Sequence, residues 1–333
     1  MLSQSQFSPN CIDFQARFNH QRAQFKILIN RFVPHRFIDR RNASNTKLAD
    51  EDLLALMCLK VYYQLTTWMA LYRLVKNILP GLTMIEYSRF TRRIKQMGPV
   101  LQVIRQGLSS WTNPGSVAII DSYPLPLCQY VRNLHASVFA GYADLGYNAT
   151  KKQHFYGFKV HMVATPGGLI LNYVVTPASV SDVKVALTVT QDCPCPNILA
   201  DVGYISKDLR TAFAQRGYTF WTPYRSNMKG AKEHNNPVLK RTRRLIETTF
   251  SKLTAAGSEH TCTRSLAGLR AQIESIITAH NLRILGNGNV TNYQFTYFNN
   301  SILLRTVSSE IKATCSFSLG NVNLYRLSFS SKV

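Results

Sequence analysis

The sequence has few acidic residues and no long apolar segment. Only 17 Asp and Glu residues stand against 39 Lys and Arg residues, which gives a formal net charge of +22. This shortage of acids disfavours acidic proteins and small sugars as the main partner. Basic side chains gain affinity for phosphates by replacing condensed counterions, so the charge favours nucleic acid, with a merely solvated basic surface as the alternative.

Segments that would direct the chain to a membrane are also missing. No apolar run approaches the roughly 18 residues that a membrane span requires. Residues 1–7 contain no basic region followed by an apolar stretch, as a signal peptide would. The seven cysteines are odd in number and scattered, and no His or second Cys pair stands at zinc-site spacing around Cys193 and Cys195. We therefore expect a soluble cytoplasmic protein with reduced thiols and no membrane contact.

The first third of the chain is basic and helical. Residues 1–47 hold eight cations without a long periodic segment, which suits either a DNA-contacting arm or a basic helix-and-loop lead-in. Periodicity and turn signals then predict a helix from Asp50, helices over 66–79 and about 83–96, and a short helix after a break at Gly98-Pro99. A helix, a turn and a basic helix are typical of helix-turn-helix DNA readers, although such packing also occurs without DNA. The cations of the third helix are Arg89, Arg92, Arg93 and Lys95.

Strands alternate with helices in the rest of the chain. Apolar runs and turns predict strands over 116–121, 197–201 and 218–223, and a hairpin of 154–165 with 169–176. Helices are predicted from Asp182 and over 207–216, 240–253 and 266–285. This order predicts an α/β fold with a mixed sheet flanked by helices, behind an all-α region. The expected division is a basic arm (1–47), a helical DNA-end-binding domain (48–112), a catalytic domain (113–285) and a tail of unknown role (286–333).

Three acidic residues stand in distinct local settings. Asp121 and Asp201 end two predicted buried strands, and Glu247 lies in a basic helical pattern. Ligands of open α/β sheets gather at the carboxyl ends of strands. Cutting a phosphodiester requires stabilised charge on the attacking and leaving oxygens, which two divalent cations held by carboxylates supply. Each acid taken alone also fits a turn, a cap, or an ion pair of Glu247 with Arg243 or Lys252.

Residues 48–285 resemble a bacterial insertion-sequence transposase of the DDE type. The resemblance rests on residues 118–122 (AIIDS), 199–204 (LADVGY) and 243–253 (RRLIETTFSKL), reinforced by 151–161 (KKQHFYGFKVH) and 176–183 (TPASVSDV). It implies a ribonuclease-H-like catalytic fold in which Asp121, Asp201 and Glu247 hold Mg²⁺, with Mn²⁺ as a possible substitute. It also implies nicking at the element's ends, attack of the freed 3′-hydroxyl on target DNA, and a homodimer on paired ends.

The sequence departs from the family pattern at two positions. Lys240 stands where a tyrosine precedes the helix arginine, and Thr254 stands where a lysine follows the glutamate. The family pattern has no counterpart of the tail.

Further basic residues are candidates for contacts with double-stranded DNA, both terminal inverted repeats and target. Those near the expected site are Lys151, Lys152, Lys159, Arg243 and Lys252, although alternate positions of a hairpin also face plain solvent. Trp221 and Tyr224 suit either the core or stacking on a frayed base. Two rival functions remain at this stage: a structure-selective nuclease or resolvase of the same fold, and an inactive DNA-binding derivative.

Overall fold

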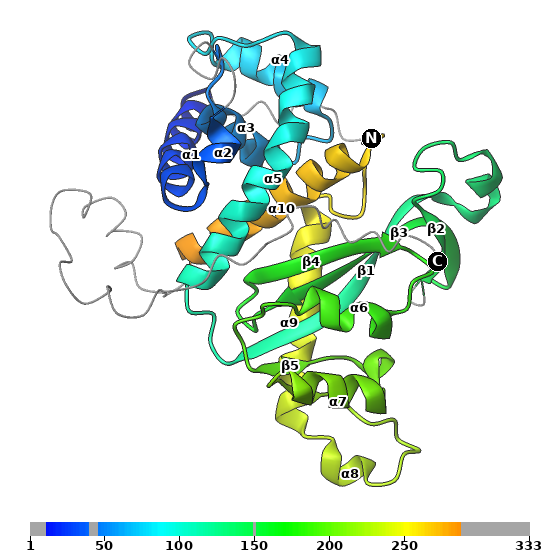
Figure 1. Ribbon diagram of the computed structural model, residues 1–333. Coiled ribbons are helices and arrows are strands. Elements are labelled where there is room, and N and C mark those ends of the chain that lie inside the picture. Colours follow the sequence, from blue (N-terminus) through cyan, green and yellow to red (C-terminus); the bar gives the residue numbers. More distant parts are fainter. Residues whose placement is uncertain (1–10, 40–45, 149–150, 288–333) are drawn as a thin grey trace, which may run out of the picture.

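The computed structural model describes residues 11–39, 46–148 and 151–287, so most of the predicted tail lies outside the described residues. A helical part stands against one end of a mixed sheet (Figure 1). Its helices are α1 (Cys11–Phe32), α2 (His35–Ile38), α3 (Asp50–Tyr62), α4 (Trp68–Ile78), α5 (Tyr87–Trp111) and, from the other end of the sequence, α10 (Leu266–Asn287). Among the described helices, none combines the length and the apolar character needed to cross a membrane.

The sheet contains antiparallel and parallel strands, as the sequence predicts. Its strands are β1 (Val117–Gln129), β2 (Asp144–Asn148), β3 (Gln153–Ala164), β4 (Ile170–Pro177), β5 (Asn197–Leu199) and β6 (Thr219–Trp221). β3 pairs antiparallel with β1 along one edge and with β2 and then β4 along the other. β5 pairs parallel with β1, and β6 parallel with β5. This topology confirms the expected mixed sheet behind an all-α region.

Helices cover both faces of the sheet, and successive residues of β1 point to opposite faces. Ile119 and Tyr123 share a buried cluster with Ile246 and Leu253 of α9 (Pro237–Ala255). Ile120 belongs to a second cluster, which includes side chains of α6 (Asp182–Val189) and α7 (Lys207–Gln215). The two sides are called the α9 face and the α6 face below. Asp121 lies two residues after Ile119 in the same strand, so its side chain also points to the α9 face.

β1 is longer than the sequence suggested. The expectation that its strand ends at Asp121 is wrong, because antiparallel pairing with β3 continues to Gln129. Pairing with β5 stops at Ile119, and no described strand pairs with that edge of β1 beyond it. Pro124 and Pro126 lie in this extension, where a missing N–H costs no ladder hydrogen bond. Because proline is rare inside sheets, these two residues argued against a strand at this place in the sequence.

The helical part differs from the sequence analysis in two places: its first helix is longer than the lack of periodicity suggested, and the break expected at Gly98-Pro99 is wrong. Residues 1–47 contain the long helix α1, whose inward face buries Phe14, Phe18, Phe25, Leu28 and Ile29. α5 runs without interruption through Gly98 and Pro99. A Cβ on Gly98 would lie 3.4 Å from backbone atoms of Ala271, so the glycine serves the close crossing of α5 and α10. Burial against α10 sustains the helix despite the hydrogen bond that proline removes.

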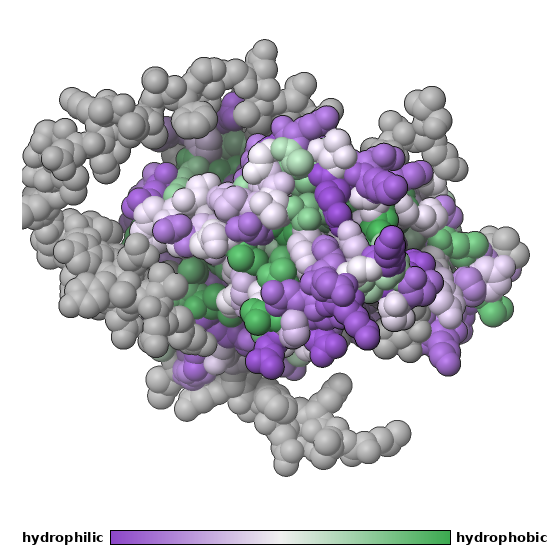
Figure 2. Space-filling view, turned by 90° about the horizontal axis from the view of Figure 1, so that it is seen from below, coloured by the Kyte–Doolittle hydropathy of each residue, from purple (hydrophilic) through white to green (hydrophobic). Residues whose placement is uncertain are grey.

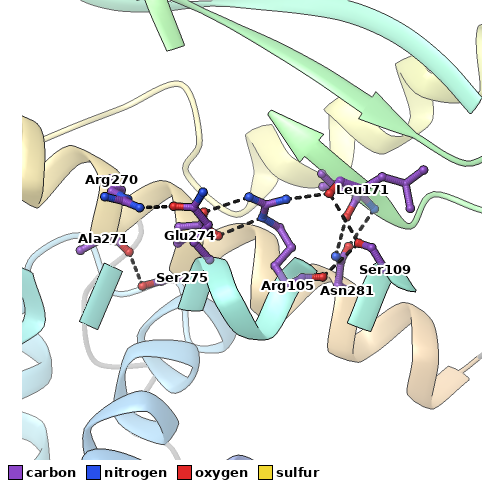
Figure 3. A network of polar contacts seen from close by, with 10 residues as sticks. Arg105, Ser109, Leu171, Arg270, Ala271, Glu274, Ser275 and Asn281 are labelled. Atoms are coloured by element: carbon purple, nitrogen blue, oxygen red, sulfur yellow. Dashed lines mark hydrogen bonds and ion pairs between the residues drawn. The ribbon is translucent and has the colours of Figure 1, made fainter. Parts of the chain in front are cut away.

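A buried polar network joins the helical part to the sheet (Figure 3). Arg105 of α5 donates to Glu274 of α10 at 3.1 Å and to the Leu171 carbonyl oxygen of β4 at 2.6 Å. Both charged side chains are 1% exposed. Asn281 of α10 donates to the Ile170 carbonyl oxygen and accepts from the Ile170 amide, which ties the same helix to β4. Buried hydrogen bonds and one buried ion pair therefore connect the helical part to the sheet.

Candidate active site

Asp121 lies where β1 loses β5 as its neighbour. Its side chain is 21% exposed, and one carboxylate oxygen accepts the Ser122 amide at 2.8 Å. Burial raises the pKa of Asp121 to about 6, and the neighbouring charge of Asp201 adds to this rise. The Ser122 amide and the Arg243 guanidinium act in the opposite direction by stabilising the carboxylate.

Asp201 follows the short strand β5 and precedes the 3₁₀ turn η4 (Val202–Tyr204). β5 ends at Leu199, beside Ile119 of β1, so the chain leaves the sheet close to Asp121. The Asp201 side chain is 44% exposed, and no described side-chain hydrogen bond caps η4. Its carboxylate is accordingly more open to solvent than that of Asp121.

Glu247 and Arg243 lie one turn apart on α9. Asn236 caps this helix by accepting from the Val238 and Leu239 amides, and Pro237 occupies its first turn, where a missing N–H does no harm. Ile246 and Leu253 bury the inner side of the helix against the sheet. Glu247 is 58% exposed, and its position at the helix edge brings its carboxylate toward β1 and the end of β5.

Arg243 is the group that brings the three acids together. Its Nη1 lies 3.3 Å from Asp121 Oδ2, and its Nη2 lies 3.5 Å from Asp201 Oδ1 and 3.0 Å from Glu247 Oε1. The Arg243 side chain is only 15% exposed. Residues separated by as many as 126 positions thus meet around one cation, as the spacing 247 − 121 shows. The sequence prediction that the three carboxylates converge agrees with this geometry.

The donor set suits a hard divalent cation in its chemistry but not in its spacing. Three carboxylates are oxygen ligands of the kind that Mg²⁺ takes together with water. Among the described residues, however, no group of three His, Cys, Asp or Glu side chains stands close enough to hold a metal ion. The carboxylates are arranged around a guanidinium, which keeps them further apart than metal ligands are.

Comparison with known proteins bears on this part of the chain. Residues 112–266, which include all three acids, match the family model described as "Transposase DDE domain". Residues 112–266 are a transposase DDE domain. Enzymes of this family depend on divalent metal ions.

Other comparisons are weaker. No match was found among curated proteins. Among solved structures, the chain is similar to a piggyBac transposase in a synaptic complex with hairpin DNA, with 14% identity over 92% of this chain and 77% of that chain and a TM-score of 0.31. It is also similar to a chain of a pre-cleavage Mos1 transpososome, with 9% identity over 85% of this chain and 99% of that chain and a TM-score of 0.21. At such TM-scores the assignment rests on the family match.

A second polar cluster of the transposase domain lies on the α6 face. Asp182 Oδ1 accepts from Ser122 Oγ at 3.0 Å and from Lys159 Nζ at 3.2 Å. His161 Nδ1 lies 3.4 Å from the same oxygen. The sequence predicts Asp182 only as the first residue of a helix. The alternation of Lys159 and His161 along one side of β3 was the available signal for a shared partner.

His161 is neutral at neutral pH, so its contact with Asp182 is not an ion pair. The side chain is 1% exposed, its Nε2 lies 2.9 Å from Thr176 Oγ1, and its Nδ1 has no described hydrogen-bond partner. Burial lowers its pKa to about 4, against the raising effect of Asp182 and with the lowering effect of Lys159. Lys159 therefore supplies the positive charge that balances Asp182.

This burial predicts an acid-sensitive contribution to the stability of the protein. The folded pKa of His161 is below its unfolded value near 6.5, so stability is fully present above pH ~6.5 and is lost as the pH falls toward 4. The loss is up to about 3 kcal/mol at 1.36 kcal/mol per pKa unit. Urea unfolding between pH 7 and 4.5 should show a steeper decline for the wild type than for His161→Gln, which cannot titrate. Parallel pH profiles for the two proteins would contradict the prediction.

The candidate DNA-contacting cations fall into two groups. Arg89, Arg92, Lys95, Lys152 and Lys252 are exposed. Lys151 is also exposed and lies 3.5 Å from Glu259. Arg93 instead bonds to Asp50 and to the Leu48 carbonyl oxygen, and its side chain is 12% exposed. Lys159 is held by Asp182 on the α6 face, away from the three acids, so neither it nor Arg93 reaches phosphate unless these bonds break.

The end of the transposase domain beyond α7 and α8 (Ala231–His234) carries cations that the sequence did not single out. Figure 2 views this end and shows hydrophilic residues over much of the face, with smaller hydrophobic groups between them. The exposed cations here are Arg210 of α7, Lys232 of α8, and Arg225 and Lys229 of the segment between β6 and α8. Trp221 and Tyr224 both stack on His234, with ring centroids 5.8 and 3.7 Å apart, so their faces are engaged within the protein.

Proposed function

We propose that this protein is a DNA transposase that cuts DNA at the ends of its own mobile element in a Mg²⁺-dependent reaction and joins the freed 3′-hydroxyl to target DNA. The observation that carries the proposal is the convergence of Asp121, Asp201 and Glu247 around one position in a transposase DDE domain. Bound Mg²⁺ would polarise the phosphodiester and neutralise charge on the attacking and leaving oxygens, with Mn²⁺ as a substitute.

The chain's own residues have distinct tasks in this proposal. The two aspartates and Glu247 are the metal ligands, held by β1, by the turn after β5 and by α9. The exposed cations Lys151, Lys152 and Lys252 contact phosphates close to the scissile bond, where such contacts position the duplex without reading its sequence. The helical part reads the terminal inverted repeats in this proposal, which the exposure of Arg89, Arg92 and Lys95 on α5 supports. We propose a homodimer because two ends must be cut and joined together.

Removal of the metal tests the cutting step. In EDTA the protein is expected to bind linear DNA carrying the element's terminal repeats but to leave it intact, because the carboxylates alone cannot stabilise the oxygen charges. Addition of Mg²⁺ or Mn²⁺ should restore nicking, measured on end-labelled DNA in denaturing gels. Gel-shift titration in EDTA is the control for binding. Cleavage in EDTA at the rate seen with Mg²⁺ would refute the proposed metal site.

A second assay separates the transposase from a nuclease or resolvase of the same fold. Pre-nicked ends with a free 3′-hydroxyl are incubated with a supercoiled target plasmid and Mg²⁺, and joined products are scored by their altered mobility. The proposal expects single-end and double-end joining. Cutting without any joining would favour the nuclease, and DNA binding without cutting would favour an inactive derivative.

A further inference from the structure

We propose that Arg243 is an internal counter-cation that occupies the place between the three carboxylates and competes with divalent metal for them. The inference rests on the proposed function, since it takes Asp121, Asp201 and Glu247 as the metal ligands. Its basis is the set of three ion pairs of 3.0–3.5 Å that one guanidinium makes with all three acids.

The two occupants are sterically and electrostatically exclusive. Oxygen ligands of Mg²⁺ lie 2.0–2.1 Å from the ion, in near-ideal octahedral geometry. The carboxylate oxygens lie 3.0–3.5 Å from two different nitrogens of the planar guanidinium. Among the described residues, no three potential ligands lie close enough together to bind one metal ion. Metal binding must draw the oxygens inward onto a point that the guanidinium covers. The added positive charge would also repel Arg243, so the arginine has to leave.

The metal-free arrangement is stabilised for a clear reason. Asp121 is largely buried beside Asp201, and two neighbouring carboxylates repel each other in a poorly solvated site. A guanidinium with several N–H donors in a fixed plane can bridge these acids at once, which a compact ammonium group cannot do. Arg243 therefore keeps the three ligands assembled before any metal arrives.

The displaced guanidinium has a suitable partner in the substrate. Arginine matches phosphate oxygens with paired hydrogen bonds, and α9 carries Arg243 on the sheet side of a helix whose exposed surface is already basic. DNA phosphate near the site would stabilise the displaced arginine and so ease metal entry. Binding of metal and of DNA should then be mutually reinforcing, because coupling between two ligands is reciprocal.

Mn²⁺ titration of the full-length protein, followed by electron paramagnetic resonance, tests the competition directly. Arg243→Gln should bind Mn²⁺ on the order of tenfold more tightly than the wild type, within the usual range of coupled sites. Arg244→Gln is the matched control, since it removes the same charge from the next, exposed position of α9. It should change the affinity less than about twofold, because charges exposed to solvent are screened.

A second arm adds DNA. A short duplex of arbitrary sequence should tighten Mn²⁺ binding by the wild type and by Arg244→Gln, and should have much less effect on Arg243→Gln. If Arg243→Gln is too unstable to purify, Arg243→Lys provides the same comparison, because its point charge cannot bridge three carboxylates. This variant should fall between the wild type and the expected Gln value.

The outcomes separate the inference from the proposed function. Equal or weaker Mn²⁺ binding by Arg243→Gln relative to Arg244→Gln, at a site that Asp201→Asn removes, overturns the counter-cation role and leaves the metal site intact. Mn²⁺ binding that Asp201→Asn does not affect, in either arginine background, overturns the metal site and the inference with it. Tighter binding that depends on both Asp201 and the loss of Arg243 supports the competition.

Discussion

Asp201→Asn is expected to lower the rate of metal-dependent DNA cleavage by about 10³-fold or more, while DNA binding is retained. The scale follows from removing one member of a group that acts as a unit, for which losses of this size or larger are usual. Asparagine has nearly the same shape but no charge, so it loses much of its attraction for a divalent cation. The measurement is the single-turnover nicking rate of end-labelled DNA in Mg²⁺, with gel-shift affinity measured in parallel.

Asp201 is the most informative of the three acids to replace. Its side chain is 44% exposed, so an amide there remains solvated. Asp121 is 21% exposed and accepts the Ser122 amide, so its replacement would mix loss of chemistry with loss of structure. The Glu247 side chain is 58% exposed and flexible, so the effect of replacing it would be harder to interpret.

Asp208→Asn supplies the control for Asp201→Asn. Asp208 is an exposed acid in the first turn of α7, on the same segment of chain, with the same change of charge and size. It should retain the wild-type nicking rate within about twofold, because it lies outside the group that Arg243 joins. Cleavage that survives Asp201→Asn, with the protein folded and bound to DNA, would show that the site assignment is wrong.

The sequence was enough to identify the candidate acids because the features that mark them lie in neighbouring residues. Asp201 follows an apolar run, and Glu247 lies on a helix with a clear cap and apolar stripe, so neither setting depends on distant partners. The mixed sheet could be predicted for the same reason, since turns and alternation mark β3, β4 and their hairpin. What these patterns encode is which elements form and in what order.

Other features depend on contacts between distant segments, which the sequence does not display. The sequence predicts a phosphate contact or a surface ion pair for Arg243, whereas its contact with Asp121 joins residues 122 positions apart, which no local pattern indicates. The strand extension past Asp121 contains two prolines that only an unpaired edge tolerates. Helix α5 continues through Pro99 because α10 packs against it from 168 positions away, as the Gln102–Arg270 contact shows.

Glu274→Gln is expected to lower the free energy of unfolding by about 3–5 kcal/mol, the usual cost of leaving a buried charge without its partner. Arg105 is 1% exposed, and Glu274 is its only described acidic partner, at 3.1 Å. The Leu171 carbonyl oxygen accepts one of its donors but cannot neutralise its charge. Because α5, α10 and β4 meet at this pair, its loss should loosen the junction between the helical part and the sheet. Urea unfolding at neutral pH measures the effect.

Two further variants show that the cost arises from the unpaired charge. Glu259→Gln removes one charge of the partly exposed pair with Lys151 and should change the free energy of unfolding by less than about 1 kcal/mol. The double variant Arg105→Met with Glu274→Leu removes both charges and should recover most of the lost stability, because apolar replacements of a buried pair are often neutral or stabilising. If Glu274→Gln behaves like Glu259→Gln, water reaches the pair. If the double variant is as unstable as Glu274→Gln, hydrogen-bond geometry rather than charge holds α5 and α10 to the sheet.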